Sequence, residues 1–265
     1  MKKQKFLIFG MAFFVTLFVL CGAVLVHQCA DGQKSAKAFA DVAKLVQEVQ
    51  ETPENDAAET VPREVTAYEK YVPVLAENSD FVGWLSIDGT QINYPVVQTP
   101  DATNYYLKRN FQKQHSNYGT PYVQENCDID LSDNIVIYGH NMRDGSMFAD
   151  LCKYEDEDFY KTHKVIRFDT LSDYGEYEIV AAFKTVAYSD DGFKYYHFVN
   201  AESRAEFDAF IRECKKLSHY DTGVDAKYGD KLLTLSTCEY SRENGRMVVV
   251  AKRVESAEKG AEADA

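Results

Sequence analysis

The sequence is poor in the residues that mark fibrous and low-complexity proteins. Its 265 residues include only six prolines, fourteen glycines and one tryptophan. Collagen-like chains need glycine at every third position, and low-complexity linkers are rich in glycine and proline, so both classes are excluded. Tyrosine (18) and phenylalanine (16) are abundant, and aromatic side chains favour β-strands. The composition therefore predicts a folded protein rich in sheet.

Positive charge is also scarce. Lysine and arginine total 29 against 42 acidic residues, which gives a net charge of −13. A surface this negative repels phosphate backbones. We therefore expect no nucleic-acid partner.

The six cysteines lack the spacing of a metal site or a disulfide framework. No C-x-x-C pair occurs, which disfavours a zinc knuckle and a dense set of disulfides. Four of the histidines are scattered and are interpreted as surface residues, so we expect no metal and no cofactor. The cysteines are Cys21, Cys29, Cys127, Cys152, Cys214 and Cys238, and these histidines are His115, His163, His197 and His219.

One long apolar run lies at the N-terminus. Three lysines precede an uncharged stretch from Phe6 to Val26, and about 20 apolar residues suffice to span a bilayer. Because basic residues stay on the cytoplasmic side, we predict a cytoplasmic segment 1–5, a membrane anchor 6–26 and an extracellular remainder. A cleaved signal peptide ending near Cys21–Ala23, a lipoprotein signal ending at Cys21 and a buried core helix are the alternatives.

The rest of the chain divides by composition. Residues 27–62 are predicted to be an extracellular stalk or linker, in part helical because Val42, Leu45, Val46 and Val49 recur at helical spacing. The end of this segment, from Glu51 to Pro62, has two prolines and four acidic residues and is interpreted as a solvated spacer. Residues 63–254 form the main predicted folded domain, and residues 255–265 a flexible tail.

Short strands dominate the pattern of residues 63–254. Many short strands with few helices predict a mainly β fold, a closed or nearly closed barrel. Asp88–Gly89 marks a hairpin between the first two strands. The expected helices are Val65–Ala76, broken or kinked near Pro73, then Ser146–Tyr160, and Ala201–Leu217 with Asn200 as N-cap. The expected strands are Val82–Ile87, Ile92–Val97, Tyr105–Phe111, Pro121–Gln124, Ile135–Tyr138, Val165–Phe168, Tyr177–Tyr188, Leu232–Thr237 and Met247–Val254.

Three residues at strand ends suggest acyl-transfer chemistry. Cys238 ends an apolar strand, Arg246 opens the next strand eight residues later, and His140 follows Ile135–Gly139. A thiolate is a nucleophile, a histidine can exchange its proton, and an arginine can hold a developing oxyanion. Taken singly, the cysteine is typical of a core residue, the histidine of a turn and the arginine of a solvated edge. Their combination on an exported domain indicates a cysteine enzyme.

The motifs Thr234–Cys238 with Arg246, and Tyr138–Asn141 upstream, resemble those of the sortases, and of class B in particular. The resemblance covers roughly Arg63 to Val254. Ser236 inside the first motif, the N-terminal helical extension and the helical insert at Ala201–Leu217 before the cysteine strand are the features similar to class B. The resemblance implies a closed eight-stranded sortase-type β-barrel.

The resemblance also implies roles and partners. It implies a membrane-anchored cysteine transpeptidase that cleaves a C-terminal sorting signal after threonine and joins the threonine carbonyl to a cell-wall amine. Its partners would be surface proteins that carry such signals, peptidoglycan or its lipid-linked precursor, and the membrane. By motif, Cys238 corresponds to the nucleophile, His140 to the general acid/base and Arg246 to the oxyanion or substrate clamp. The residues implied to bind substrate are Tyr138, Ser236, Thr237 and, by similarity to an asparagine that class B enzymes place by the substrate, Asn104.

Other functions stay open at this point. A papain-like C-G-[SA]-C-[WY] string and an S/T-H-G-C-x-R transpeptidase signature are absent. Hydrolysis of the same signal would use the same acyl-enzyme, and a non-catalytic wall-binding β-barrel would not need the three residues together. The exact sorting signal and the acceptor amine do not follow from the sequence.

Overall fold

The computed structural model describes residues 2–51, 65–189 and 192–254. Eight strands close into a barrel in the order β1-β2-β3-β4-β7-β8-β6-β5, which confirms the predicted fold class. The pairs β2–β3 and β4–β7 are parallel and the other neighbours are antiparallel. The strands are β1 (Phe81–Ser86), β2 (Asn93–Val97), β3 (Tyr122–Val123), β4 (Asn134–Tyr138), β5 (Val165–Thr170), β6 (Glu176–Val186), β7 (Leu232–Cys238) and β8 (Gly245–Arg253).

The barrel closes over a core of apolar side chains. The paired strands β7 and β8 are buried almost throughout, and Leu235, Val248 and Val249 are fully inaccessible. The predicted hairpin at Asp88–Gly89 joins β1 to β2, which pair antiparallel. Burial of this kind contributes about 25 cal/mol per Å² of apolar surface, and it holds the ends of β4, β7 and β8 in fixed register.

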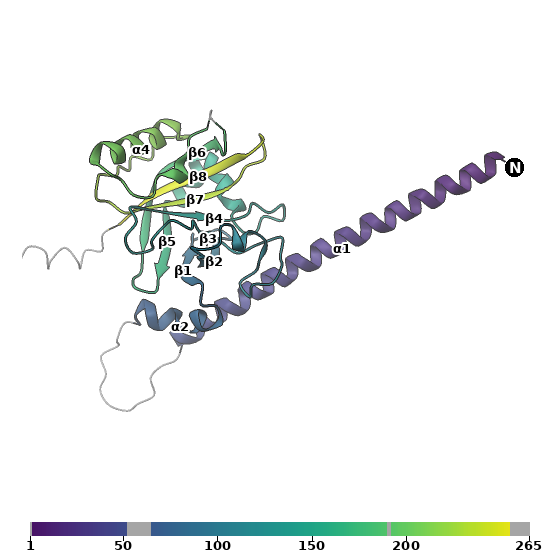
Figure 1. Cartoon of the computed structure of the whole chain (residues 1–265), viewed down its shortest axis with the longest axis horizontal. Helices are drawn as coiled ribbons and strands as arrows, with labels where there is room; N and C mark the ends of the chain where they lie inside the picture. Colours follow the sequence, from purple (N-terminus) through teal and green to yellow (C-terminus); the bar gives the residue numbers. More distant parts are fainter. Residues whose placement is uncertain (1, 52–64, 190–191, 255–265) are drawn as a thin grey trace, which may run out of the picture.

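A single long helix, α1 (Lys2–Glu51), projects from the barrel (Figure 1). Its segment from Phe9 is long and apolar enough to cross a membrane and is the one such helix in the described part of the chain. Further along, Phe39, Val42 and Val46 are buried, and Phe39 packs edge to face on Tyr94. Much of the predicted stalk 27–62 is therefore helix that packs on the barrel. Of the predicted spacer Glu51–Pro62, Glu51 ends α1 and residues 52–62 lie outside the described residues, as does the predicted tail 255–265.

Two helices flank opposite sides of the barrel (Figure 1). Helix α2 (Ala67–Glu77) starts with a capping box in which Thr66 and Glu69 bond reciprocally, and it continues past Pro73 without a break. Helix α4 (Arg204–Leu217) buries one stripe of side chains against β6. Its N-cap is Ser203, whose hydroxyl accepts from the Glu206 amide, so the prediction of Asn200 as N-cap was wrong. Asn200 instead accepts a hydrogen bond from the amide of Asp133.

The predicted strand Tyr105–Phe111 was wrong. The segment begins with a 3-10 helix, η1 (Tyr105–Lys108), entered through Asn104 in the left-handed conformation at φ 56°. Tyr106, Asn110 and Phe111 are its buried residues, a spacing that does not alternate as a strand requires. The aromatic content suggested a strand, but the buried Tyr106 hydroxyl, which donates to Asp80 and accepts from Asn78, holds the turn.

The predicted helix Ser146–Tyr160 is divided into two pieces. A 3-10 helix, η2 (Ala149–Glu155), is followed by α3 (Glu157–Thr162). Asp156 lies between them and caps α3 by accepting from the amide of Asp158 at 2.8 Å. An aspartate that bonds the backbone in this way starts a new helix and does not continue the old one. A third 3-10 turn, η3 (Tyr195–His197), precedes α4.

Candidate active site

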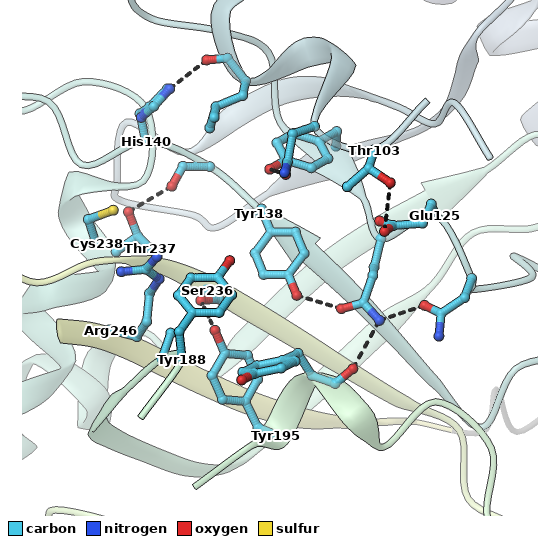
Figure 2. A pocket seen from close by; sticks show the side chains of 18 of the residues that line it. Thr103, Glu125, Tyr138, His140, Tyr188, Tyr195, Ser236, Thr237, Cys238 and Arg246 are labelled. Atoms are coloured by element: carbon cyan, nitrogen blue, oxygen red, sulfur yellow. Dashed lines mark hydrogen bonds between the residues drawn. The ribbon is translucent and has the colours of Figure 1, made fainter. Parts of the chain in front are cut away.

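The parallel pairing of β4 with β7 brings the two predicted motifs to one edge of the barrel. Tyr138 at the end of β4 lies in register with Ser236, so the residues that follow each strand emerge side by side. Strand β8 returns antiparallel with Arg246 directly opposite Cys238. Three residues that are far apart or a hairpin apart in the sequence therefore lie around one cleft (Figure 2).

The cleft has a volume of about 760 Å³. All seven residues predicted from the sequence line it. This places them together; it does not assign their chemical roles, which stay predictions. They are Asn104, Tyr138, His140, Ser236, Thr237, Cys238 and Arg246.

Hydrogen bonds connect the two motif segments. The Gly139 amide donates to the Ser236 carbonyl at 3.2 Å, and the Thr237 hydroxyl donates to the Gly139 carbonyl at 2.8 Å. Thr237 is buried, as is Ser236, whose hydroxyl bonds the Tyr195 hydroxyl at 2.6 Å. Both predicted substrate-binding hydroxyls are therefore engaged within the protein and brace the wall of the cleft.

His140 is held from behind by the backbone. Its Nε2 lies 2.6 Å from the Leu107 carbonyl oxygen. A carbonyl can only accept, so Nε2 carries a proton in this geometry, while Nδ1 has no hydrogen-bond partner among the residues that the structure describes. In the described part of the chain, no hydrogen bond joins the imidazole to the thiol of Cys238.

Two glycines make room around this histidine. A Cβ at Gly139 would lie 2.5 Å from the Phe148 ring, so only glycine permits the ring to pack under the histidine segment. Gly119 has φ +63°, and a Cβ there would meet the Leu107 carbonyl oxygen at 2.7 Å and His140 at 3.2 Å. Gly119 and Leu107 were missed from the sequence because they reach the histidine only through the fold.

Cys238 and Arg246 stand on the opposite wall. Both are half-buried, and Cys238 is a free thiol. The guanidinium donates through Nη1 to the Gly245 carbonyl at 2.9 Å and lies 5.9 Å from the centre of the Tyr188 ring. Figure 2 shows Cys238 and Arg246 as neighbours below His140. A permanent cation beside a thiol can stabilise negative charge on sulfur or on a bound carbonyl oxygen.

Tyrosines form much of the remaining wall. The Tyr138 hydroxyl bonds Gln124, and the Tyr122 hydroxyl donates to Asn104 at 2.7 Å. Burial raises the pKa of Tyr138 and of Tyr122 far above the ordinary value, and it raises the pKa of Tyr195 to about 12. These phenols therefore stay neutral at physiological pH and offer apolar faces with polar tips to a ligand.

Several cleft residues were not foreseen from the sequence. Tyr188, Tyr195 and Tyr196 extend the wall near Arg246, and His197, interpreted only as a surface residue, is exposed on the rim. The three tyrosines within residues 188–196 are the feature of the sequence that could have indicated this part of the wall. The described residues contain no group of three or more His, Cys, Asp or Glu placed to hold a metal ion.

The other thiols of the barrel are set apart from Cys238 by their environment. Burial raises the pKa of Cys127 and of Cys152 to about 11 and raises the pKa of Cys214 well above the ordinary value. A thiol with such a pKa is almost entirely protonated near neutral pH and is a poor nucleophile.

Comparison with known proteins places this geometry in a family. The sortase domain model matches residues 85–254. Sortase B of Listeria monocytogenes is 38% identical over 181 residues, which are 67% of this chain and 71% of the relative. Sortase B of Staphylococcus aureus is 35% identical over 181 residues, 66% of this chain and 70% of the relative.

Solved structures agree with this match. Sortase B of Bacillus anthracis in complex with AAEK1 superposes with a TM-score of 0.70 at 30% identity and covers 86% of this chain and 99% of that chain. The Staphylococcus aureus sortase B–substrate complex gives a TM-score of 0.73 at 27% identity, over 86% of this chain and 99% of that chain.

Proposed function

Because the chain belongs to the sortase family and is similar to class B members, all of them cysteine transpeptidases, we propose that Cys238 cleaves a C-terminal sorting signal after threonine and transfers the protein to a cell-wall amine. The observation that carries the proposal is the register of three strands. Parallel β4 and β7 set His140 beside the end of β7, and antiparallel β8 sets Arg246 opposite Cys238. No single motif has this geometry by itself.

The proposed reaction has two acyl-transfer steps. Cys238 gives its thiol proton to His140, and the resulting thiolate attacks the threonine carbonyl carbon. The oxyanion that develops is held by the Arg246 guanidinium. As the peptide bond breaks, His140 gives a proton to the leaving amine and a thioester to Cys238 remains. An acceptor amine then attacks the thioester, loses a proton to His140 and releases the thiolate.

The geometry of His140 supports the use of Nδ1 in this exchange. Its Nε2 is occupied by the Leu107 carbonyl, so Nδ1 is the nitrogen available to the leaving and arriving amines. The substrate would lie along the tyrosine wall, with Asn104, Tyr138, Ser236 and Thr237 around it. The buried hydroxyls of Ser236 and Thr237 would then act mainly by holding the wall in place.

The apolar N-terminal helix supports a membrane location. We propose that residues 6–26 span the bilayer, with residues 1–5 and their lysines in the cytoplasm and the catalytic domain outside. A surface protein with a membrane-retained sorting signal and a peptidoglycan precursor would both be available there. The helix also meets the criteria for a signal sequence, and size analysis of the mature protein separates an intact anchor from a cleaved one.

The test is a cleavage assay on the purified chain. A library of sorting-signal peptides is incubated with the protein, with and without an added amine, and products are identified by mass. Transpeptidation gives a threonine–amine conjugate only when the amine is present. A fragment that ends in a threonine carboxylate under both conditions would indicate a hydrolase. Intact peptides under both conditions would indicate a non-catalytic barrel.

A further inference from the structure

Asn141 links the segment that carries His140 to the strand that carries Cys238. It follows His140 directly in the chain, and its side-chain Nδ2 donates to the Cys238 carbonyl oxygen at 2.9 Å. Asn141 is not among the residues that line the cleft. A role in contacting substrate is therefore not indicated, and the bond to Cys238 needs another explanation.

The bond holds the peptide that follows the thiol. Strand β7 ends at Cys238, where ladder pairing no longer restrains both sides of the backbone. The amide of Glu239 donates to the Gly245 carbonyl at 2.9 Å, while Asn141 bonds the carbonyl of the same peptide unit. A peptide held at both its N–H and its C=O is restrained from rotating, so the direction in which the Cα–Cβ bond of Cys238 leaves the backbone is held.

The other side of Asn141 is equally restrained. Its own carbonyl accepts from the Tyr240 hydroxyl at 2.8 Å, and the preceding carbonyl, of His140, accepts from the Phe148 amide at 2.8 Å. The asparagine is thus a fixed bridge between two fixed backbones. It adds a hydrogen bond between the His140 segment and the Cys238 backbone, beside the bonds of Gly139 with Ser236 and Thr237. Within the described residues, no hydrogen bond joins the imidazole to the thiol directly.

We propose that Asn141 is a positioning residue that holds the Cys238 thiol at its working distance and orientation relative to His140. The inference rests on the proposed roles of those two residues. Because proton transfer and nucleophilic attack depend steeply on geometry, a misplacement of about 1 Å can reduce the rate by about 10²-fold. Asn141 does not line the cleft and would act through Cys238, so its loss should lower kcat and leave KM nearly unchanged.

A second contact supplies a matched control. Nδ2 of Asn141 also lies 3.3 Å from the Cys152 sulfur, and an amide nitrogen has two hydrogens for two acceptors. Sulfur is the weaker acceptor, and Cys152 does not line the cleft. Cys152→Ala removes this contact and should leave kcat within about threefold of wild type, the scale of a minor change.

The experiment compares variants of the full chain on one cleaved sorting-signal peptide. Asn141→Ala removes the donor, and Asn141→Asp keeps the shape but offers an ionised acceptor to the Cys238 carbonyl. Both should lower kcat by about 10–100-fold with KM within about threefold. Asn134→Ala, at the other end of β4, is the control for stability alone, because its buried side chain bonds Phe198 and Thr234.

Any of three results would overturn the inference. The first is a kcat of Asn141→Asp within threefold of wild type, and the second is a loss of kcat/KM that comes from a higher KM. The third is an equal loss of kcat in Asn134→Ala when its melting temperature matches that of the Asn141 variants. Cys238→Ala run alongside separates the two levels of the argument. If Cys238→Ala is inactive and Asn141→Asp is normal, the positioning role alone fails. If Cys238→Ala retains turnover, the proposed function fails.

Discussion

The two ends of the parallel pair β4–β7 use polar residues in opposite ways. At the starting end, Asn134 is fully buried; its Nδ2 donates to the Phe198 carbonyl at 2.7 Å and its Oδ1 accepts from Thr234 at 2.8 Å. At the finishing end, His140, Cys238 and Arg246 are only half-buried around an open cleft. The same two strands thus hold a closed polar cluster at one end and reactive groups at the other.

The difference shows how the fold separates stability from chemistry. A buried amide whose donor and acceptor are both bonded helps to specify the pairing of the strands. Each buried polar group left without a hydrogen-bond partner would lower the stability of the fold by about 1–3 kcal/mol. Reactive groups need exposed donors and acceptors that a substrate can reach, so they lie where the strands end. Changes at the two ends should accordingly affect different measurements.

The largest effect is expected from Cys238→Ala. Without the thiol no acyl-enzyme can form, so cleavage of the sorting peptide should fall to background. One sulfur is lost from a half-buried strand end, and the free energy of unfolding should drop by less than about 2 kcal/mol. Peptide turnover and thermal melting check this; turnover in a folded variant would assign the nucleophile elsewhere.

Arg246→Ala should have the next largest effect. Loss of one oxyanion donor reduces the rate by about 10²–10³, and Arg246→Lys should also be impaired because it keeps the charge but loses the planar fork. The measurement is kcat/KM on one peptide. Near-normal activity of both variants would remove the guanidinium from the mechanism.

Asn134→Ala should act at the stable end alone. It leaves the Thr234 hydroxyl and the Phe198 carbonyl without their partner, which should lower the free energy of unfolding by about 1–3 kcal/mol. Activity per folded molecule should stay within about twofold, since effects of separate sites are usually independent. Denaturant unfolding and kcat are the measurements, and a large fall in kcat would mean that the two ends are coupled.

A thiol reagent should label Cys238 in the cleft about tenfold or more faster than Cys127 and Cys152 near pH 7. Cys238 borders an open cleft, whereas burial raises the pKa of Cys127 and Cys152 to about 11, so their reactive thiolate is scarce. Peptide mapping after brief iodoacetamide treatment gives the rate at each site; Cys21 and Cys29 on α1 are exposed and are scored separately. Raising the pH towards 11 should narrow the difference in labelling rate, because the thiolate fraction of the buried cysteines grows. Equal labelling at pH 7 would make Cys238 an ordinary thiol.

Arg242→Ala should have the smallest effect, less than about threefold in kcat/KM, the scale of a screened surface charge. Arg242 is exposed in the turn between β7 and β8, while Arg246 is fixed by the ladder opposite Cys238. The same peptide assay ranks the two. If kcat/KM falls strongly in Arg242→Ala and stays near wild type in Arg246→Ala, Arg242 and not Arg246 is the oxyanion donor.

Much of the barrel was predictable because its strands carry strong local signals. Leu232–Thr237 and Met247–Val254 are rich in leucine and valine and are joined by a polar turn, so their pairing followed from the sequence. Tyr105–Phe111 was misassigned because aromatic residues favour strands whereas burial of Tyr106 favours a turn here. The division at Asp156 was missed because a capping aspartate within an apolar helical pattern is a weak signal.

The sequence by itself determined the identity of the reactive groups: a thiol ending one apolar strand, an arginine opening the next and a histidine after a third. These are local patterns of residue type and spacing, and they suffice to propose the chemistry. Only the tertiary structure decided what holds these groups in place. The Leu107 carbonyl reaches His140 across 33 positions of the chain, and the Asn141 amide reaches Cys238 across 97. Contacts of this kind depend on strand order and register, which are set by the packing of the whole barrel and leave no mark in the neighbouring residues.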